Sequence, residues 1–116
     1  MALKYMDNKK DDQYYIKKII ENIMFAIEHT KDISYDEFIC DEVFINAIMF
    51  SFIQISEYAS KLSDFYKSNH KEIRWNEMRS IRNKIVHDYD IVDGKIIYET
   101  VKNDFPPLIK MIKENI

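Results

Sequence analysis

Glycine and proline are scarce in this sequence. Among 116 residues there are one glycine and two prolines, which is too little turn chemistry for a sheet of many strands. Apolar residues are common, and a chain of this length can bury one hydrophobic core. We therefore expect an all-α fold, an antiparallel bundle of four to five helices that forms a single domain over residues 1–116.

Cysteine is almost absent as well. Cys40 is the single cysteine, so the chain can form neither an internal disulfide nor a cysteine-based zinc site. The three histidines are scattered and have no metal-ligand spacing, and we expect no metal and no other cofactor. Residues 1–12 are polar and charged, without an apolar core of signal-peptide length. These features predict a cytoplasmic protein whose residues 1–10 fray.

Long hydrophobic runs and strong net charge are also missing. The most apolar stretch, residues 43–55, is interrupted by Asn46, Ser51 and Gln54 and is too short to cross a bilayer. The net charge of −3 argues against nucleic-acid binding through the whole surface. Positive charge is nevertheless concentrated, because residues 61–84 contain seven cations and three anions, a net charge of +4 that leaves −7 for the rest.

Helical periodicity begins near the amino terminus. Isoleucines recur at spacings of three and four, which predicts an amphipathic helix over about residues 10–29. Ser34 followed by Glu37 is typical of a capping box, so a short helix should start near Tyr35. Asp41 can cap the helix that follows.

Three further helices are expected after Asp41. The second long helix should run from 41 to about 68, and a third from about 75 to about 87. Asp93 and Gly94 are a turn signal, after which a helical stripe restarts. Two consecutive prolines at 106–107 must kink or split this last helix near residues 103–107, because proline removes an amide donor and crowds the preceding turn.

The second long helix is apolar on nearly all sides. Its large or apolar side chains are Val43, Phe44, Ile45, Ala47, Ile48, Met49, Phe50, Phe52, Ile53 and Ile55. Leaving such side chains in water would cost roughly 1.5 to 3 kcal/mol each. The helix must therefore be central to a bundle or face a second subunit. We expect a dimer, although a central helix in a monomer explains the pattern equally well.

The residues that suggest chemistry lie between positions 82 and 89. Arg82 and His87 are five residues apart, so they border one groove only if a helix ends or bends near His87. A histidine at such a helix end suits proton transfer near neutral pH, and an arginine suits a phosphate or a phosphorane. Together they suggest phosphodiester chemistry. The spacing by itself is more often that of a salt-bridged surface pair.

A wider resemblance is carried by the run RNKIVHDYDIVDGKIIYETVKNDFPPLIKMI. It resembles the carboxyl-terminal half of a HepT-like HEPN domain, whose motif is R-x4-H-x-Y. Arg82, His87 and Tyr89 occupy the three motif positions, and Asn83 occupies the polar position that commonly follows the arginine. The segments SYDEF, QISEYASKL, IRWNEMR and NDFPPL resemble the family in order and spacing, so the likeness extends from Asp11 onward.

This resemblance implies a metal-independent endoribonuclease, the toxin of a type VII-like toxin–antitoxin pair. It further implies a homodimer, or a larger oligomer, in which two R-x4-H motifs meet across a cleft that binds RNA. His87 would handle the proton, Arg82 would stabilise charge on the phosphorane, and Asn83 would orient one of them or the phosphate. The expected partner is a minimal nucleotidyltransferase that transfers AMP onto Tyr89 and so silences the toxin.

The chain departs from the family in the second long helix. Ser56, Glu57 and Tyr58 stand where relatives typically have Gly-Glu-Ala. Glu57 is a candidate support for Arg82, although a solvated glutamate on a helix explains it more simply. The two larger neighbours would narrow the expected cleft.

The positive segment suggests where RNA would lie. The best candidates to guide its backbone are Arg74, Arg79 and Lys84, although a charge run is usually just a solvated face. Two other functions stay open. The domain could be a noncatalytic module that presents substrate or Tyr89 to a nucleotidyltransferase, or a structural dimerisation domain whose motif is a surface ion-pair cluster.

Overall fold

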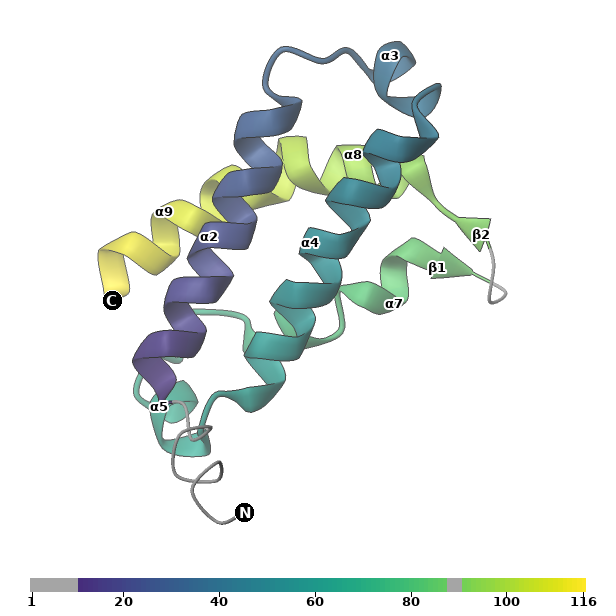
Figure 1. Ribbon diagram of the computed structural model, residues 1–116. Helices are drawn as coiled ribbons and strands as arrows, with labels where there is room; N and C mark the ends of the chain where they lie inside the picture. Colours follow the sequence, from purple (N-terminus) through teal and green to yellow (C-terminus); the bar gives the residue numbers. More distant parts are fainter. Residues whose placement is uncertain (1–10, 88–90) are drawn as a thin grey trace, which may run out of the picture.

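Two long antiparallel helices form the centre of the molecule (Figure 1). The computed structural model describes residues 11–87 and 91–116, with the backbone alone at positions 84, 86, 87, 91 and 92. Helices α2 (Asp12–Thr30) and α4 (Glu42–Lys61) pack along each other, and a helical segment at the carboxyl end crosses them. The predicted helical fold is confirmed, with one pair of two-residue strands as the exception.

The first two helices begin where the sequence predicts. Asp11 caps α2, since its carboxylate accepts the amide of Tyr14 at 3.0 Å. In α3 (Tyr35–Ile39) the predicted capping box is confirmed: the hydroxyl of Ser34 accepts the Glu37 amide at 3.1 Å, and the Glu37 carboxylate accepts the Ser34 amide at 3.0 Å. Hydrogen bonding of the Glu37 carboxylate to Ser34, first to its backbone amide and then to its side chain, lowers the pKa of Glu37.

The prediction that the second long helix continues to about residue 68 is wrong. Asp41 caps α4 as expected, accepting the amide of Phe44 at 3.0 Å, but α4 ends at Lys61 and a separate helix, α5 (Asp64–Ser68), follows. The break is held by Asp12, whose carboxylate accepts the amide of Ser63 at 2.8 Å and its hydroxyl at 2.6 Å. Ser63 in turn caps α5.

The predicted third helix over about residues 75–87 is also interrupted. It is replaced by α6 (Trp75–Arg79), a turn, and α7 (Arg82–Ile85). Strand β1 (Val86–His87) then pairs antiparallel with β2 (Ile91–Val92), so that His87 lies opposite Ile91. The Asp93 amide donates to the Ile85 carbonyl at 2.9 Å and closes this hairpin onto the end of α7.

The last helical segment changes type instead of splitting. Asp93 caps α8 (Gly94–Glu99), and a π-helix, η1 (Thr100–Asp104), leads into α9 (Phe105–Asn115). Both prolines lie in the first turn of α9, the part of a helix that tolerates proline best. From η1, the Lys102 ammonium donates to the carbonyls of Thr30 at 2.5 Å and Lys31 at 3.4 Å, which fastens the end of α2.

Helix α4 connects most parts of the core. Its buried face includes Ile48, Phe52, Ile55 and Ala59, and it packs against α2, α6, α7 and α8. By length and composition α4 is, among the described helices, the one apolar enough to cross a membrane. Its packing against these neighbours and α3 accounts for the apolar residues on its buried side.

Candidate functional site

Helix α7 holds two of the predicted site residues at the surface. Ile81, just before it, is 5% exposed and Ile85, at its end, is 0% exposed, so both ends of this short helix are anchored in the core. Arg82 and Asn83 lie between these anchors and are exposed. A guanidinium and an amide are thus available side by side to a ligand in solvent, and both can bind a phosphate group.

The position of His87 follows from the hairpin. The helix ends at Ile85, and the backbone of His87 continues in β1, opposite Ile91. Arg82 and His87 therefore belong to two short elements that adjoin each other, with a helix end between them as the spacing argument requires. The His87 side chain and the whole of Tyr89 lie outside the described residues. Their predicted roles therefore stay predictions.

Glu57 is not joined to Arg82 within one chain. Glu57 is exposed on α4. In the parts of the chain that the structure describes, the ion pairs are Lys18–Glu21 and Arg74–Glu77, so a Glu57–Arg82 pair is not among them. Any support of Arg82 by Glu57 would have to be less direct than an ion pair.

The two enlarged neighbours of Glu57 have different surroundings. Tyr58 packs against the rings of Tyr14 and Tyr15 on α2, with ring centroids 6.2 and 6.1 Å apart, and burial, followed by the charge of Tyr14, raises the pKa of Tyr58. Ser56 is buried, and its hydroxyl donates to the carbonyl of Arg79 at the end of α6. Tyr58 thus fills space against α2, while Ser56 reaches the segment that leads to Arg82.

The three candidate RNA-binding cations differ in whether a nearby anion is paired with them. The Arg74 guanidinium lies 3.4 Å from the Glu77 carboxylate, and both side chains are exposed. Arg79 is exposed at the other end of α6 and belongs to neither ion pair found in the described residues. The Lys84 side chain lies outside the described residues. Arg79 is therefore the better placed of the two described arginines to meet a phosphate.

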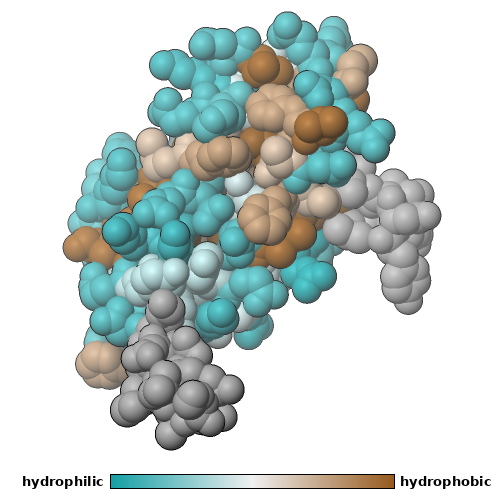
Figure 2. Space-filling view, in the orientation of Figure 1, coloured by the Kyte–Doolittle hydropathy of each residue, from teal (hydrophilic) through white to brown (hydrophobic). Residues whose placement is uncertain are grey.

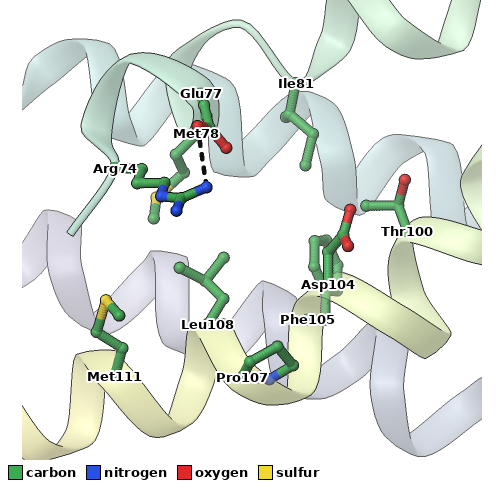
Figure 3. Close-up of a pocket in the computed structure, with 10 residues that line it drawn as sticks. All are labelled: Arg74, Glu77, Met78, Ile81, Thr100, Asp104, Phe105, Pro107, Leu108 and Met111. Carbon is green, nitrogen blue, oxygen red and sulfur yellow. Dashed lines mark hydrogen bonds and ion pairs between the residues drawn. The ribbon is translucent and has the colours of Figure 1, made fainter.

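A hollow of about 370 Å³ lies between α6 and the η1–α9 segment (Figure 3). Its walls are mostly apolar, and Ile81 points into it while Arg74 and Glu77 flank one side. The lining residues are Arg74, Glu77, Met78, Ile81, Thr100, Asp104, Phe105, Pro107, Leu108 and Met111. Sequence patterns missed it because the two walls come from distant segments of ordinary core residues. Among the side chains that the structure describes, no three from His, Cys, Asp or Glu gather as metal ligands.

An apolar surface lies over α2 and α4 (Figure 2). On α4, Val43 is 81% exposed and Phe50 is 58% exposed, and on α2 Phe25 is 39% exposed. Phe25, Ala47 and Phe50 also line a shallow hollow between the two helices. We call Phe25, Val43, Ala47 and Phe50 the α2–α4 face. One chain therefore leaves part of its central helix uncovered.

Comparison with known proteins identifies the family. A family model described as ribonuclease HepT-like matches residues 19–115. The chain is 33% identical to the probable ribonuclease HepT of Thermococcus cleftensis, over 86% of this chain and 91% of that protein. It is 32% identical to a protein of Caldanaerobacter subterraneus subsp. tengcongensis named "Putative RNase", over 90% of this chain and 94% of the relative.

A further relative comes from Methanocaldococcus jannaschii. This protein, also named "Putative RNase", is 32% identical over 91% of this chain and 88% of its own length. No solved structure gives a significant match. The family model spans most of the chain, including α7 and β1, and the relatives match over nearly their full length. The chain therefore belongs to the ribonuclease HepT-like family.

Proposed function

We propose that this protein is a metal-independent endoribonuclease whose active site is built on α7 and β1. The observation that carries the proposal is the exposure of Arg82 and Asn83 on an anchored helix, directly before the strand that contains His87. Membership of a ribonuclease family supports RNA as the substrate. The residue types suit the reaction, because a guanidinium binds phosphate and an imidazole transfers protons near neutral pH.

The reaction would begin with attack by the ribose 2′-oxygen on the adjacent phosphorus. One group removes the 2′-hydroxyl proton, a bond forms between that oxygen and phosphorus, and the bond from phosphorus to the 5′-oxygen breaks. A second group protonates the leaving 5′-oxygen. His87 is suited to either proton transfer, and Arg82 to the extra negative charge on the phosphorane. Asn83 would orient Arg82 or the phosphate.

Two proton-transfer groups are easier to supply from two chains than from one. Each chain has one histidine in the motif, and a two-fold dimer doubles it. The α2–α4 face is our proposed contact for the second chain, because Phe50 and Val43 lose contact with water only if another surface covers them. Helix α7 packs against α4, so a chain on this face would approach the motif.

RNA would enter along the positive segment. Residues 61–84 carry a net charge of +4 in a chain of net charge −3, so a polyanion is attracted locally and not by the whole surface. Arg79 and Lys84 flank Arg82 in sequence and are our candidates for backbone contacts. Arg74 contributes less, since Glu77 already neutralises much of its charge.

Regulation would act on Tyr89. We infer that a minimal nucleotidyltransferase transfers AMP from ATP to this tyrosine, as the likeness to toxin–antitoxin HEPN domains suggests. The phenol oxygen forms a bond to the α-phosphorus, pyrophosphate leaves, and the phenol proton is released. The attached nucleotide adds bulk and negative charge two residues from His87, where the substrate phosphate would bind.

Removing the motif side chains should abolish RNA cleavage. For His87→Ala we expect the cleavage rate of a single-stranded RNA in EDTA to fall by about 10² to 10⁴. For Arg82→Ala we expect a fall of about 10² to 10³. His70→Asn is the control, because His70 lies at the turn after α5 and binds the carbonyl of Tyr66, a contact that asparagine can keep. Cleavage that survives His87→Ala would exclude His87 as the catalyst, and wild type that cuts no RNA would favour a noncatalytic module.

A charge on the α2–α4 face should separate the two chains. Wild type is expected to sediment at twice the 14.0 kDa mass of one chain, and Phe50→Glu at the mass of a monomer. Phe65→Glu is a matched control, since Phe65 is even more exposed, at 76%, but lies on α5. A monomeric wild type, or dimers of Phe50→Glu, would contradict the proposed interface.

Two arginines of one helix allow a test of the RNA path. Arg79→Gln should weaken RNA binding and lower the slope of log K against log salt by about 0.7, the value for one phosphate contact with a single strand. Arg74→Gln should change both less, because Arg74 is paired with Glu77. Equal effects of the two substitutions would show that Arg79 contributes no more to RNA binding than Arg74 does.

Coexpression with a minimal nucleotidyltransferase should modify one tyrosine. Mass spectrometry of the wild type is expected to find AMP on the peptide that contains Tyr89, with loss of RNA cleavage. Tyr89→Phe should stay unmodified and active in the same cells. A neutralised complex in which Tyr89 carries no nucleotide would show that inhibition works by another route.

A further inference from the structure

One long-range hydrogen bond reaches the segment that carries Arg82. The Ser56 hydroxyl, on α4, donates to the Arg79 carbonyl, 23 residues later in the chain. Ser56 is 4% exposed. Serine and threonine inside helices commonly bond to the carbonyl four residues earlier, as Thr30 does with Ala26 at 2.8 Å and Ser60 with Ser56 at 3.0 Å. Ser56 instead bonds to another helix.

The acceptor of this bond is a carbonyl left over by the break between α6 and α7. In a continuous α-helix the Arg79 carbonyl would accept the Asn83 amide, four residues later. The Asn83 amide donates instead to the Ser80 carbonyl at 2.9 Å, one residue closer. A buried carbonyl without a donor is unfavourable, and the Ser56 hydroxyl supplies the donor at the place where the helix is interrupted.

The break decides which residue faces the core. Arg82 follows Trp75 by seven positions and Met78 by four, so in an uninterrupted helix it would share their stripe. Trp75 and Met78 are buried, and a guanidinium on that stripe would lose hydration that exposed Arg82 keeps. In the structure Ile81 is buried and points into the hollow beside α9 (Figure 3). Arg82, in contrast, is exposed.

We propose that Ser56 is a positioning residue for Arg82: its hydroxyl holds the α6–α7 break open, and the break keeps the guanidinium at the surface where a substrate phosphate can bind. This role rests on the proposed ribonuclease function for its catalytic consequence, but its structural part concerns the exposure of Arg82 alone. The two parts can be measured separately.

The structural part is tested by chemical modification of arginine. Phenylglyoxal is the probe, and mass spectrometry follows the modification rates of Arg82 and Arg74 in the same sample. For Ser56→Ala we expect Arg82 to react several-fold more slowly than in wild type, with Arg74 unchanged as the internal reference. Ser56→Thr keeps the hydroxyl and should restore the wild-type rate. An Arg82 rate unaffected by Ser56→Ala overturns the proposal.

The catalytic part is tested with a short fluorogenic oligoribonucleotide. Ser56→Ala should lower kcat about tenfold or more, since small displacements of a catalytic group are costly, and leave KM nearly unchanged. In an Arg82→Ala background the same substitution should have almost no further effect, because it acts through Arg82. Effects that multiply in the double variant would mean general damage to the fold and would refute a positioning role.

Two further variants keep the outcome decisive. Thr30→Val deletes another buried hydroxyl, one whose bond stays within α2, and should leave kcat and the Arg82 modification rate unchanged. If Ser56→Ala does not fold, Ser56→Cys keeps a similar volume with a weaker donor and should have a smaller effect in the same direction. If wild type cuts no RNA, the proposed function fails, while the modification rates still decide whether Ser56 positions Arg82.

Discussion

The packing of α4 in the core is the contact on which the site depends. The elements that carry the motif cannot hold their own shape: α7 has four residues, and β1 and β2 have two each. Helices and hairpins of that size are unstable in isolation. They persist because Ile81 and Ile85 are buried, because α7 packs against α4, and because the Asp93 amide donates to the Ile85 carbonyl.

Helix α4 presents different chemistry on each of its sides. One side buries Ile48, Phe52 and Ile55 in the core, and a second meets α6 through the hydroxyl of Ser56. The third side leaves Val43 and Phe50 exposed. If a second chain covers this third side, the same rigid helix joins the dimer contact to the motif. Assembly and the geometry around Arg82 would then be coupled through one element, without any need for movement of the core.

Sequence patterns predicted the local features of the fold and missed the long-range ones. The capping box of Ser34 and Glu37 and the cap at Asp41 involve residues three apart, so a short stretch of sequence contains all the necessary information. The ends of α4 and α6 depend instead on Asp12 with Ser63 and on Ser56 with Arg79, pairs 51 and 23 residues apart. Neither break contains glycine or proline, so the local signal is weak: Ser63 is a possible helix cap, and the sequence around Ser80 resembles that of a continuing helix.

The candidate site shows the same division. Arg82 and His87 were selected by their residue types and by the resemblance to the R-x4-H-x-Y motif, and the structure places a helix end between them, as their spacing requires. The exposure of Arg82 could not be derived in this way, because its position relative to Trp75 and Met78 predicts burial. Glu57 was a candidate support for Arg82 because the resemblance places it in the second long helix, with a solvated glutamate as the simpler reading; it is exposed on α4 and forms no ion pair with Arg82 among the described residues.

The distribution of charge suits a site that can be switched by one small modification. A protein that held RNA over its entire surface would lose little from a single added phosphate. Here the net positive balance is confined to residues 61–84, and the rest of the chain has a net charge of −7. A polyanion is therefore attracted by a small local excess of positive charge and repelled by the rest of the chain. A nucleotide attached within a few residues of Arg82 would offset part of that excess and also occupy the space beside it, so one covalent step could act on both affinity and access.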